Sequence, residues 1–186
     1  MSVVLAWFGA AAAQPSPASG GMIGADLAAV RQGSDFFTFF HLEPTGPASP
    51  ERVTEFRPSG EDFRQLARLA VTVDAGGKIT AMTLTLKRSF IDDPTNGVFA
   101  RDIAKSFLRD APPAVDENGV SDLADDIEHA GGPFATANYA PKTVAYGVYT
   151  GAIRTPVTID LTRTRLSLSP SSEDGTPALT LSLTPR

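Results

Sequence analysis

The chain is 186 residues long, contains no cysteine, and carries 21 acidic against 16 basic side chains, for a formal net charge of −5 at pH 7. The lack of cysteine excludes disulfides, thiolate metal sites and a cysteine nucleophile within this sequence. The basic residues are scattered along the chain. This argues against nucleic acid and anionic membrane surfaces as partners, because both need a basic stripe.

The first residues have the pattern of a secretory signal peptide. Residues 1–13 carry no charge, hold the apolar run VVLAWF and end in three alanines. Such a segment is typical of export and is shorter than the ~20 residues of a membrane-spanning helix. We therefore expect cleavage after Ala13, a flexible leader over 14–21 and one domain over 22–186. The expected location is the bacterial periplasm or the extracellular medium, with no membrane span in the mature chain. The alternative is a disordered or partly buried apolar N-terminus.

The domain opens with two contrasting apolar patterns. Ile23, Leu27 and Val30 recur at helical spacing, which predicts a short helix that ends near Gly33. The run 35–42 (DFFTFFHL) has apolar residues at positions of both parities. A helix is the alternative, but Phe and Thr favour a pleated surface, so the run predicts a strand that is buried on both faces.

A loop, a short strand and a helical turn should come next. Three prolines in 43–50 predict the loop, weak alternation over 52–57 predicts the strand, and a capping pattern at 59–62 predicts the turn. A β-hairpin then follows, because residues 69–73 and 82–86 alternate around a glycine-rich turn. One face of this hairpin is apolar and the other is rich in threonine.

The main helix is predicted over about 97–109. Its apolar stripe runs through Ile103 and Phe107, and Thr95 or Asn96 is placed to cap its first turn. The stripe must pack on an apolar surface, and the apolar hairpin face is the obvious candidate.

The last third of the chain predicts further strands. The apolar residues of two successive strands change parity, which predicts a bulge or bend near Arg163, and a long turn is expected over 169–177. The fold class is therefore α+β: a mostly antiparallel sheet of about six to eight strands, the 97–109 helix on one face, and one or two short helices. The four strands expected in this region are 143–153, 157–162, 165–169 and 178–184.

Aromatic residues are the candidate ligand-binding groups. Four phenylalanines could line an apolar cavity between the sheet and the 97–109 helix, and glycines around two tyrosines could clear space for a ligand. The alternative is that the phenylalanines form core, because each buried Phe contributes roughly 1.5–3 kcal/mol. The candidates are Phe36, Phe37, Phe39, Phe40, Tyr146 and Tyr149.

A metal site is a weaker hypothesis, and no cofactor is predicted. On a short helix over about 122–130, Asp122, Asp125 and His129 would share one face. The favoured interpretation is a solvated helix whose acidic and basic ends complement the helix dipole.

No sequence motif specifies a reaction, so an enzymatic role is not favoured. The leading hypothesis is an exported, non-catalytic protein that binds a small apolar ligand or an envelope partner protein. One alternative is a hydrolase with a dispersed site, which requires His41 or His129 near a Ser or Asp in a cleft. The other is a structural or interaction protein that is recognised through a sheet edge.

Overall fold

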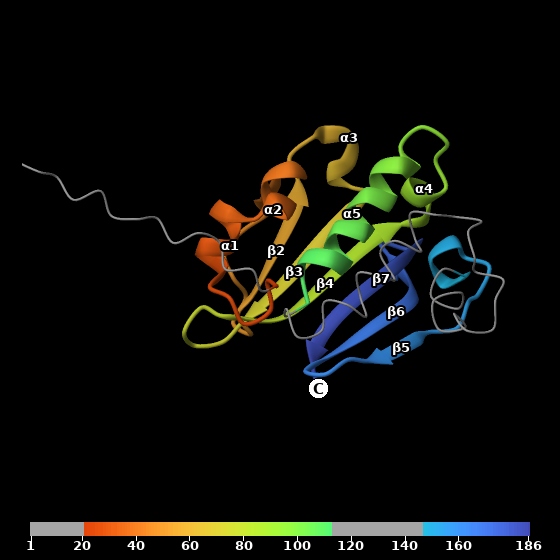
Figure 1. The fold of residues 1–186 in the computed structure, drawn as a ribbon. Helices are drawn as coiled ribbons and strands as arrows, with labels where there is room; N and C mark the ends of the chain where they lie inside the picture. The colour runs from red at the N-terminus through yellow and green to blue at the C-terminus, as the bar shows by residue number, and fades with distance from the viewer. Residues whose placement is uncertain (1–20, 113–146) are drawn as a thin grey trace, which may run out of the picture.

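The computed structural model describes residues 21–112 and 147–186, and these form one antiparallel sheet with helices packed against it (Figure 1). The sheet has seven strands in the order β1-β2-β3-β4-β7-β6-β5, which confirms the predicted α+β class and strand number. The strands are β1 (Leu42–Pro44), β2 (Val53–Pro58), β3 (Ala67–Val73), β4 (Ile79–Lys87), β5 (Val157–Asp160), β6 (Thr164–Glu173) and β7 (Thr176–Pro185). The labelled helices are α1 (Leu27–Gly33), α2 (Asp35–Phe39), α3 (Glu61–Arg64), α4 (Arg88–Ile91) and α5 (Gly97–Asp110), and residues 147–150 are also helical.

The core lies between the sheet and α5. Strand alternation places one apolar side chain of each central strand in register with its neighbours, so that a continuous row crosses the sheet. Helix α5 covers this face with a buried stripe that includes Ile103 and Phe107. The row consists of Phe56, Leu69, Leu84, Leu181 and Leu168, all fully buried.

The predicted main helix is confirmed as α5, although its first turn is organised differently. Asn96 occupies the N-cap position, but its side chain makes no capping hydrogen bond. Instead, Oδ1 of Asp93 accepts from the backbone N–H groups of Thr95 (2.8 Å) and Asn96 (2.6 Å) in the preceding turn. Helix α5 therefore begins where Asp93 closes the connection from α4.

The opposite face of the sheet is polar, as the threonine pattern of the β3–β4 hairpin predicts. Hydroxyl groups pair across strands there: Thr180 contacts Thr85 at 3.4 Å and Ser171 at 2.8 Å between oxygens. Glu173 lies at the tip of the β6–β7 hairpin on this face. Its carboxylate Oε1 lies 3.1 Å from both the Nη2 of Arg57 on β2 and the Nε of Arg68 on β3.

The strand predicted over 35–42 is wrong. Residues 35–39 form α2, and a strand begins only at Leu42. Phe36 and Phe37, adjacent in sequence, are both buried because they pack on different partners: Phe36 against Phe107 of α5 and Phe37 against Phe56 of β2. A helix positioned between two partners can bury consecutive residues without being a strand.

Two expectations for the last third are also wrong. Of the strand expected over 143–153, residues 147–150 are helical and Gly151 turns the chain with a φ of 78°. The long turn expected over 169–177 is absent, because β6 and β7 continue to a two-residue turn at Asp174 and Gly175. Both turn residues have positive φ, 52° and 74°, as a tight hairpin turn requires.

The parity change near Arg163 comes from a bend at residues 162–163 that reverses the chain between β5 and β6, which confirms the bend alternative and requires no bulge. Strands β5 and β6 pair as a hairpin, with Val157 opposite Leu168 and Ile159 opposite Leu166. This register matches odd with even positions, so both strands present their apolar residues to the same face. Among the described helices, none has the length and hydrophobicity needed to cross a membrane. The predicted segments 1–13 and 122–130 lie outside the described residues.

Candidate functional site

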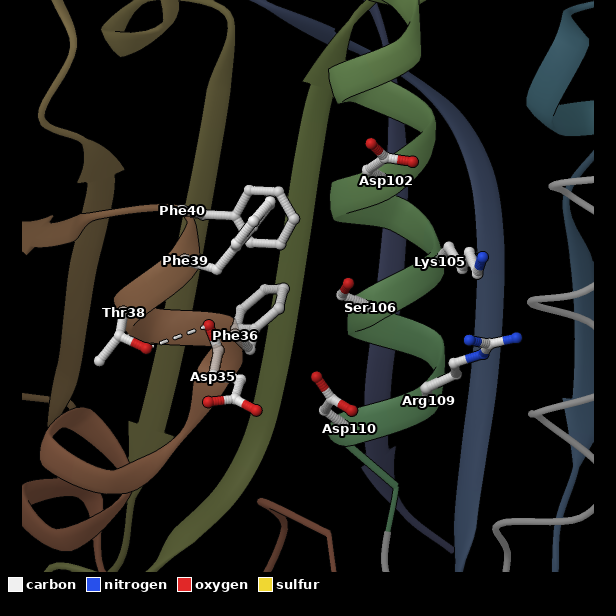
Figure 2. Close-up of a pocket in the computed structure, with 10 residues that line it drawn as sticks. All are labelled: Asp35, Phe36, Thr38, Phe39, Phe40, Asp102, Lys105, Ser106, Arg109 and Asp110. Carbon is white, nitrogen blue, oxygen red and sulfur yellow. Dashed lines mark hydrogen bonds between the residues drawn. The ribbon is translucent and has the colours of Figure 1, made fainter.

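A groove of about 560 Å³ separates α2 from α5 (Figure 2). One wall is aromatic and comes from α2 and the residue that follows it. The other wall is polar and comes from α5. The lining residues are Asp35, Phe36, Thr38, Phe39, Phe40, Asp102, Lys105, Ser106, Arg109 and Asp110.

The aromatic wall is built outward from the core. Phe36 is buried and its ring lies 6.2 Å from that of Phe107 in α5, between ring centroids. Phe40 stacks edge-on against Phe36 at 5.6 Å and against Phe39 at 4.9 Å. Phe39 is the outermost ring, and 67% of its surface is exposed. Phe39 is thus an exposed ring that contacts the half-buried Phe40, and such a ring offers an apolar contact surface to a ligand.

The polar wall follows from helix geometry. Asp102, Ser106 and Asp110 stand at i, i+4 and i+8 on α5, so they share the face that looks toward α2. Figure 2 shows the carboxylates of Asp35 and Asp110 facing each other across the gap. The α5 side of the groove therefore presents two carboxylates and a hydroxyl to α2, and α2 adds the carboxylate of Asp35 beside its phenyl rings.

Three acidic and two basic side chains line this groove. The carboxylates of Asp35, Asp102 and Asp110 make no hydrogen bond or ion pair there. Burial raises the pKa of Asp110, and the charge of Asp35 raises it further, although Arg109 opposes this effect. In Figure 2, Lys105 and Arg109 point toward the other side of α5, and both take part in further interactions.

The carboxylates are not arranged as a metal site. Within residues 21–112 and 147–186, no group of three or more His, Cys, Asp or Glu side chains is placed to hold a metal ion. The metal candidates Asp122, Asp125 and His129 lie outside the described residues, so that hypothesis stays a prediction.

The structure brings together only part of the aromatic set chosen from the sequence. Phe36, Phe39 and Phe40 line the groove, whereas Phe37 packs on Phe56 at 5.1 Å between ring centroids. Tyr149 is buried, with 5% of its surface exposed, and does not border the groove. Tyr146 lies outside the described residues.

The acidic side of the groove was missed by sequence reasoning. The available signal was the i, i+4, i+8 spacing of Asp102, Ser106 and Asp110 on the predicted helix. That spacing is equally typical of any solvated helix face, so it indicates a site only once the aromatic segment is placed opposite it.

Comparisons of the chain with models of known protein families, with curated proteins and with solved structures give no significant match. The chemistry of the groove must therefore carry the functional argument. His41, one of the two bases on which a hydrolase would depend, is exposed in the turn after α2, and its side chain makes no hydrogen bond to a Ser or Asp in the described structure. His129, the other, lies outside the described residues.

Proposed function

We propose that this is an exported, non-catalytic binding protein whose α2–α5 groove takes a small organic cation with an apolar body. The observation that carries the proposal is the exposed ring of Phe39 beside the unpaired carboxylates of Asp35, Asp102 and Asp110. An ammonium group would offset one of these negative charges, and the apolar body would cover the rings.

The groove favours a cation over the purely apolar ligand expected from the sequence. A neutral apolar ligand would take the carboxylates of Asp102 and Asp110 out of water and give them no partner in return, which is unfavourable. A hydrogen bond to a charged group contributes about 1.5–3 kcal/mol. A cation over an exposed aromatic face adds about 0.5–1 kcal/mol.

The proposal is tested by calorimetric titration at low ionic strength with phenethylammonium and its neutral analogue 2-phenylethanol. The two ligands share the phenyl ring and differ in charge. We expect phenethylammonium to bind at least ~10-fold more tightly, which corresponds to about 1.4 kcal/mol, and its affinity to fall as salt is added. Equal binding of both ligands would mean that the groove recognises only the ring, and no binding of either would reject the groove as the site.

Single substitutions locate the binding within the groove. Phe39→Ala removes the exposed ring and Asp110→Asn removes one charge, so each should weaken phenethylammonium several-fold. Phe99→Ala is the matched control, because Phe99 is 44% exposed on α5 but does not line the groove. Loss of binding in the control as well would point to a general effect on the helices.

Export is the second part of the proposal, and it rests on the signal-peptide pattern of residues 1–13. Mass spectrometry of the protein from the exported fraction of its own cells should show a chain that begins at Gln14. A chain that keeps residues 1–13 would contradict export and leave the groove proposal intact.

The alternative function, recognition of a partner protein through a sheet edge, is supported by one observation. Strand β5, four residues long, is an edge of the described sheet. A partner strand could pair with it. Failure of the titrations above would make this alternative the next to test.

A further inference from the structure

A second hollow, of about 530 Å³, lies on another part of the molecule. It is bordered by α4, by residues 147–154 and by the β6–β7 hairpin. Its wall is largely apolar and includes Val148, Ile153 and Leu179, of which Val148 and Leu179 are buried core residues. Asp92, Arg88 and Arg154 supply the charges at its border. None of its lining residues belongs to the α2–α5 groove.

Arg88 holds the border of this hollow through three hydrogen bonds to protein acceptors. Its Nη1 donates to the carbonyl of Tyr149, and its Nη2 contacts the carbonyl of Thr150 at 2.8 Å and the carboxylate of Asp92 at 2.5 Å. Gly151 permits this approach, since a Cβ at that position would lie 3.0 Å from Nη2 of Arg88. Arg88 therefore fixes residues 149–151 against α4, and Asp92 neutralises its charge.

Arg154 is the cation that remains for a ligand. It lines the hollow and is exposed, and in the described structure its guanidinium has no hydrogen bond or ion pair. Among the described residues, Asp92 is the one carboxylate that borders the hollow, and it is already paired with Arg88. A guanidinium binds a carboxylate through two parallel hydrogen bonds.

We propose that this hollow binds a small amphipathic carboxylate, with the alkyl chain against Ile153 and Leu179 and the carboxylate on Arg154. The apolar wall can cover an alkyl chain, because its side chains need no hydrogen-bond partners from the ligand. A single unpaired guanidinium matches the two oxygens of one carboxylate. The proposal is independent of the α2–α5 groove, which has the opposite charge.

Octanoate, octanol and octylammonium test the proposal, because they share the alkyl chain and differ in charge. Binding is followed by calorimetry, and the site is mapped by amide chemical shifts in ¹⁵N-labelled protein. We expect octanoate to shift amides of residues 147–154 and to bind at least ~10-fold more tightly than octanol. Equal binding of octanol, or octanoate shifts confined to other regions, would overturn the proposal.

Substitutions at the exposed Arg154 separate charge recognition from folding. Arg154→Gln should weaken octanoate at least ~10-fold, and Arg154→Glu should abolish octanoate binding and create octylammonium shifts in residues 147–154. Arg64→Gln is the matched control, because Arg64 is an exposed arginine of α3 outside the hollow. Unchanged octanoate affinity in Arg154→Gln would overturn the proposal. Phe39→Ala, in the α2–α5 groove, should leave octanoate binding unchanged, so the proposals for the two sites are tested independently.

Discussion

The carboxylate Oε1 of Glu173 lies 3.1 Å from the Nη2 of Arg57, although their strands, β6 and β2, stand four positions apart in the sheet. In a flat sheet, that separation would be about 19 Å, since neighbouring strands lie about 4.8 Å apart. The β6–β7 hairpin must therefore curl over the polar face. Arg68 contacts the same carboxylate oxygen at 3.1 Å and also reaches Glu55 at 2.7 Å, so the hairpin tip is held by a charged network.

The charged network around Glu173 should contribute measurably to the free energy of unfolding. Glu173 is 8% exposed, and its second carboxylate oxygen has no hydrogen-bond partner in the described structure. Glu173→Gln should lower the free energy of unfolding by about 2–4 kcal/mol, because it leaves Arg57 and Arg68 without their shared counter-charge. Urea denaturation measures the loss. Asp160→Asn, in the exposed pair with Arg165, is the control and should leave the midpoint nearly unchanged.

Two phenylalanines of α2, Phe36 and Phe39, should contribute very differently to the free energy of unfolding. Phe36→Ala removes a buried ring, 1% exposed, and should cost about 3–5 kcal/mol of stability. Phe39→Ala removes an exposed ring and should change stability by less than ~0.5 kcal/mol. Thermal and urea unfolding of the two variants test this division, and a large loss in Phe39→Ala would place that ring in the core and out of the proposed site.

Two helical glycines should respond to alanine with opposite sign. A Cβ at Gly97 would lie 2.7 Å from the carbonyl oxygen of Ile91, and this backbone cannot easily move. The clash should outweigh the ~1 kcal/mol that alanine gains in a helix, so that Gly97→Ala destabilises by about 1–3 kcal/mol. Gly33→Ala meets no atom within 4 Å and should be neutral or slightly stabilising. Stabilisation of both variants would mean that the α4–α5 connection can relax.

Asp110 should make stability fall as pH rises. Its folded-state pKa is raised above the ordinary value of 3.8 by burial and by Asp35. The folded state therefore holds the proton more tightly, and this contribution is complete below 3.8 and is lost as pH rises through the folded pKa. Asp110→Asn should thus raise the melting temperature at neutral pH, with a gain that shrinks toward low pH. A gain that is the same at every pH would contradict the assignment.

Local periodicity was enough to predict the elements that alternate or repeat within a few residues. The β3–β4 hairpin and α5 follow from spacing alone, because each buries one regular face. The segment 35–42 could not be assigned this way, since Phe36 and Phe37 are buried by two partners, α5 and β2, that are distant in sequence. Likewise, the long turn expected over 169–177 is replaced by strand pairing, because β6 and β7 both continue through this segment to the turn at Asp174 and Gly175.

The candidate site shows the same limit. Its aromatic half was predictable because clustered phenylalanines are unusual in a sequence. Its acidic half was not, because Asp102 and Asp110 belong to the polar face that any amphipathic helix carries. Only the packing of α2 beside α5 brings Asp35 close to Asp110 and places these carboxylates in one groove.

Amide chemical-shift mapping with phenethylammonium tests the central claim most directly. The ligand is titrated into ¹⁵N-labelled protein, with 2-phenylethanol as the uncharged comparison. The proposed function predicts that phenethylammonium shifts amides of residues 35–40 and 102–110 and that 2-phenylethanol shifts them far less. Shifts that are absent, that map to other residues, or that are equal for both ligands would contradict a cation-binding groove between α2 and α5.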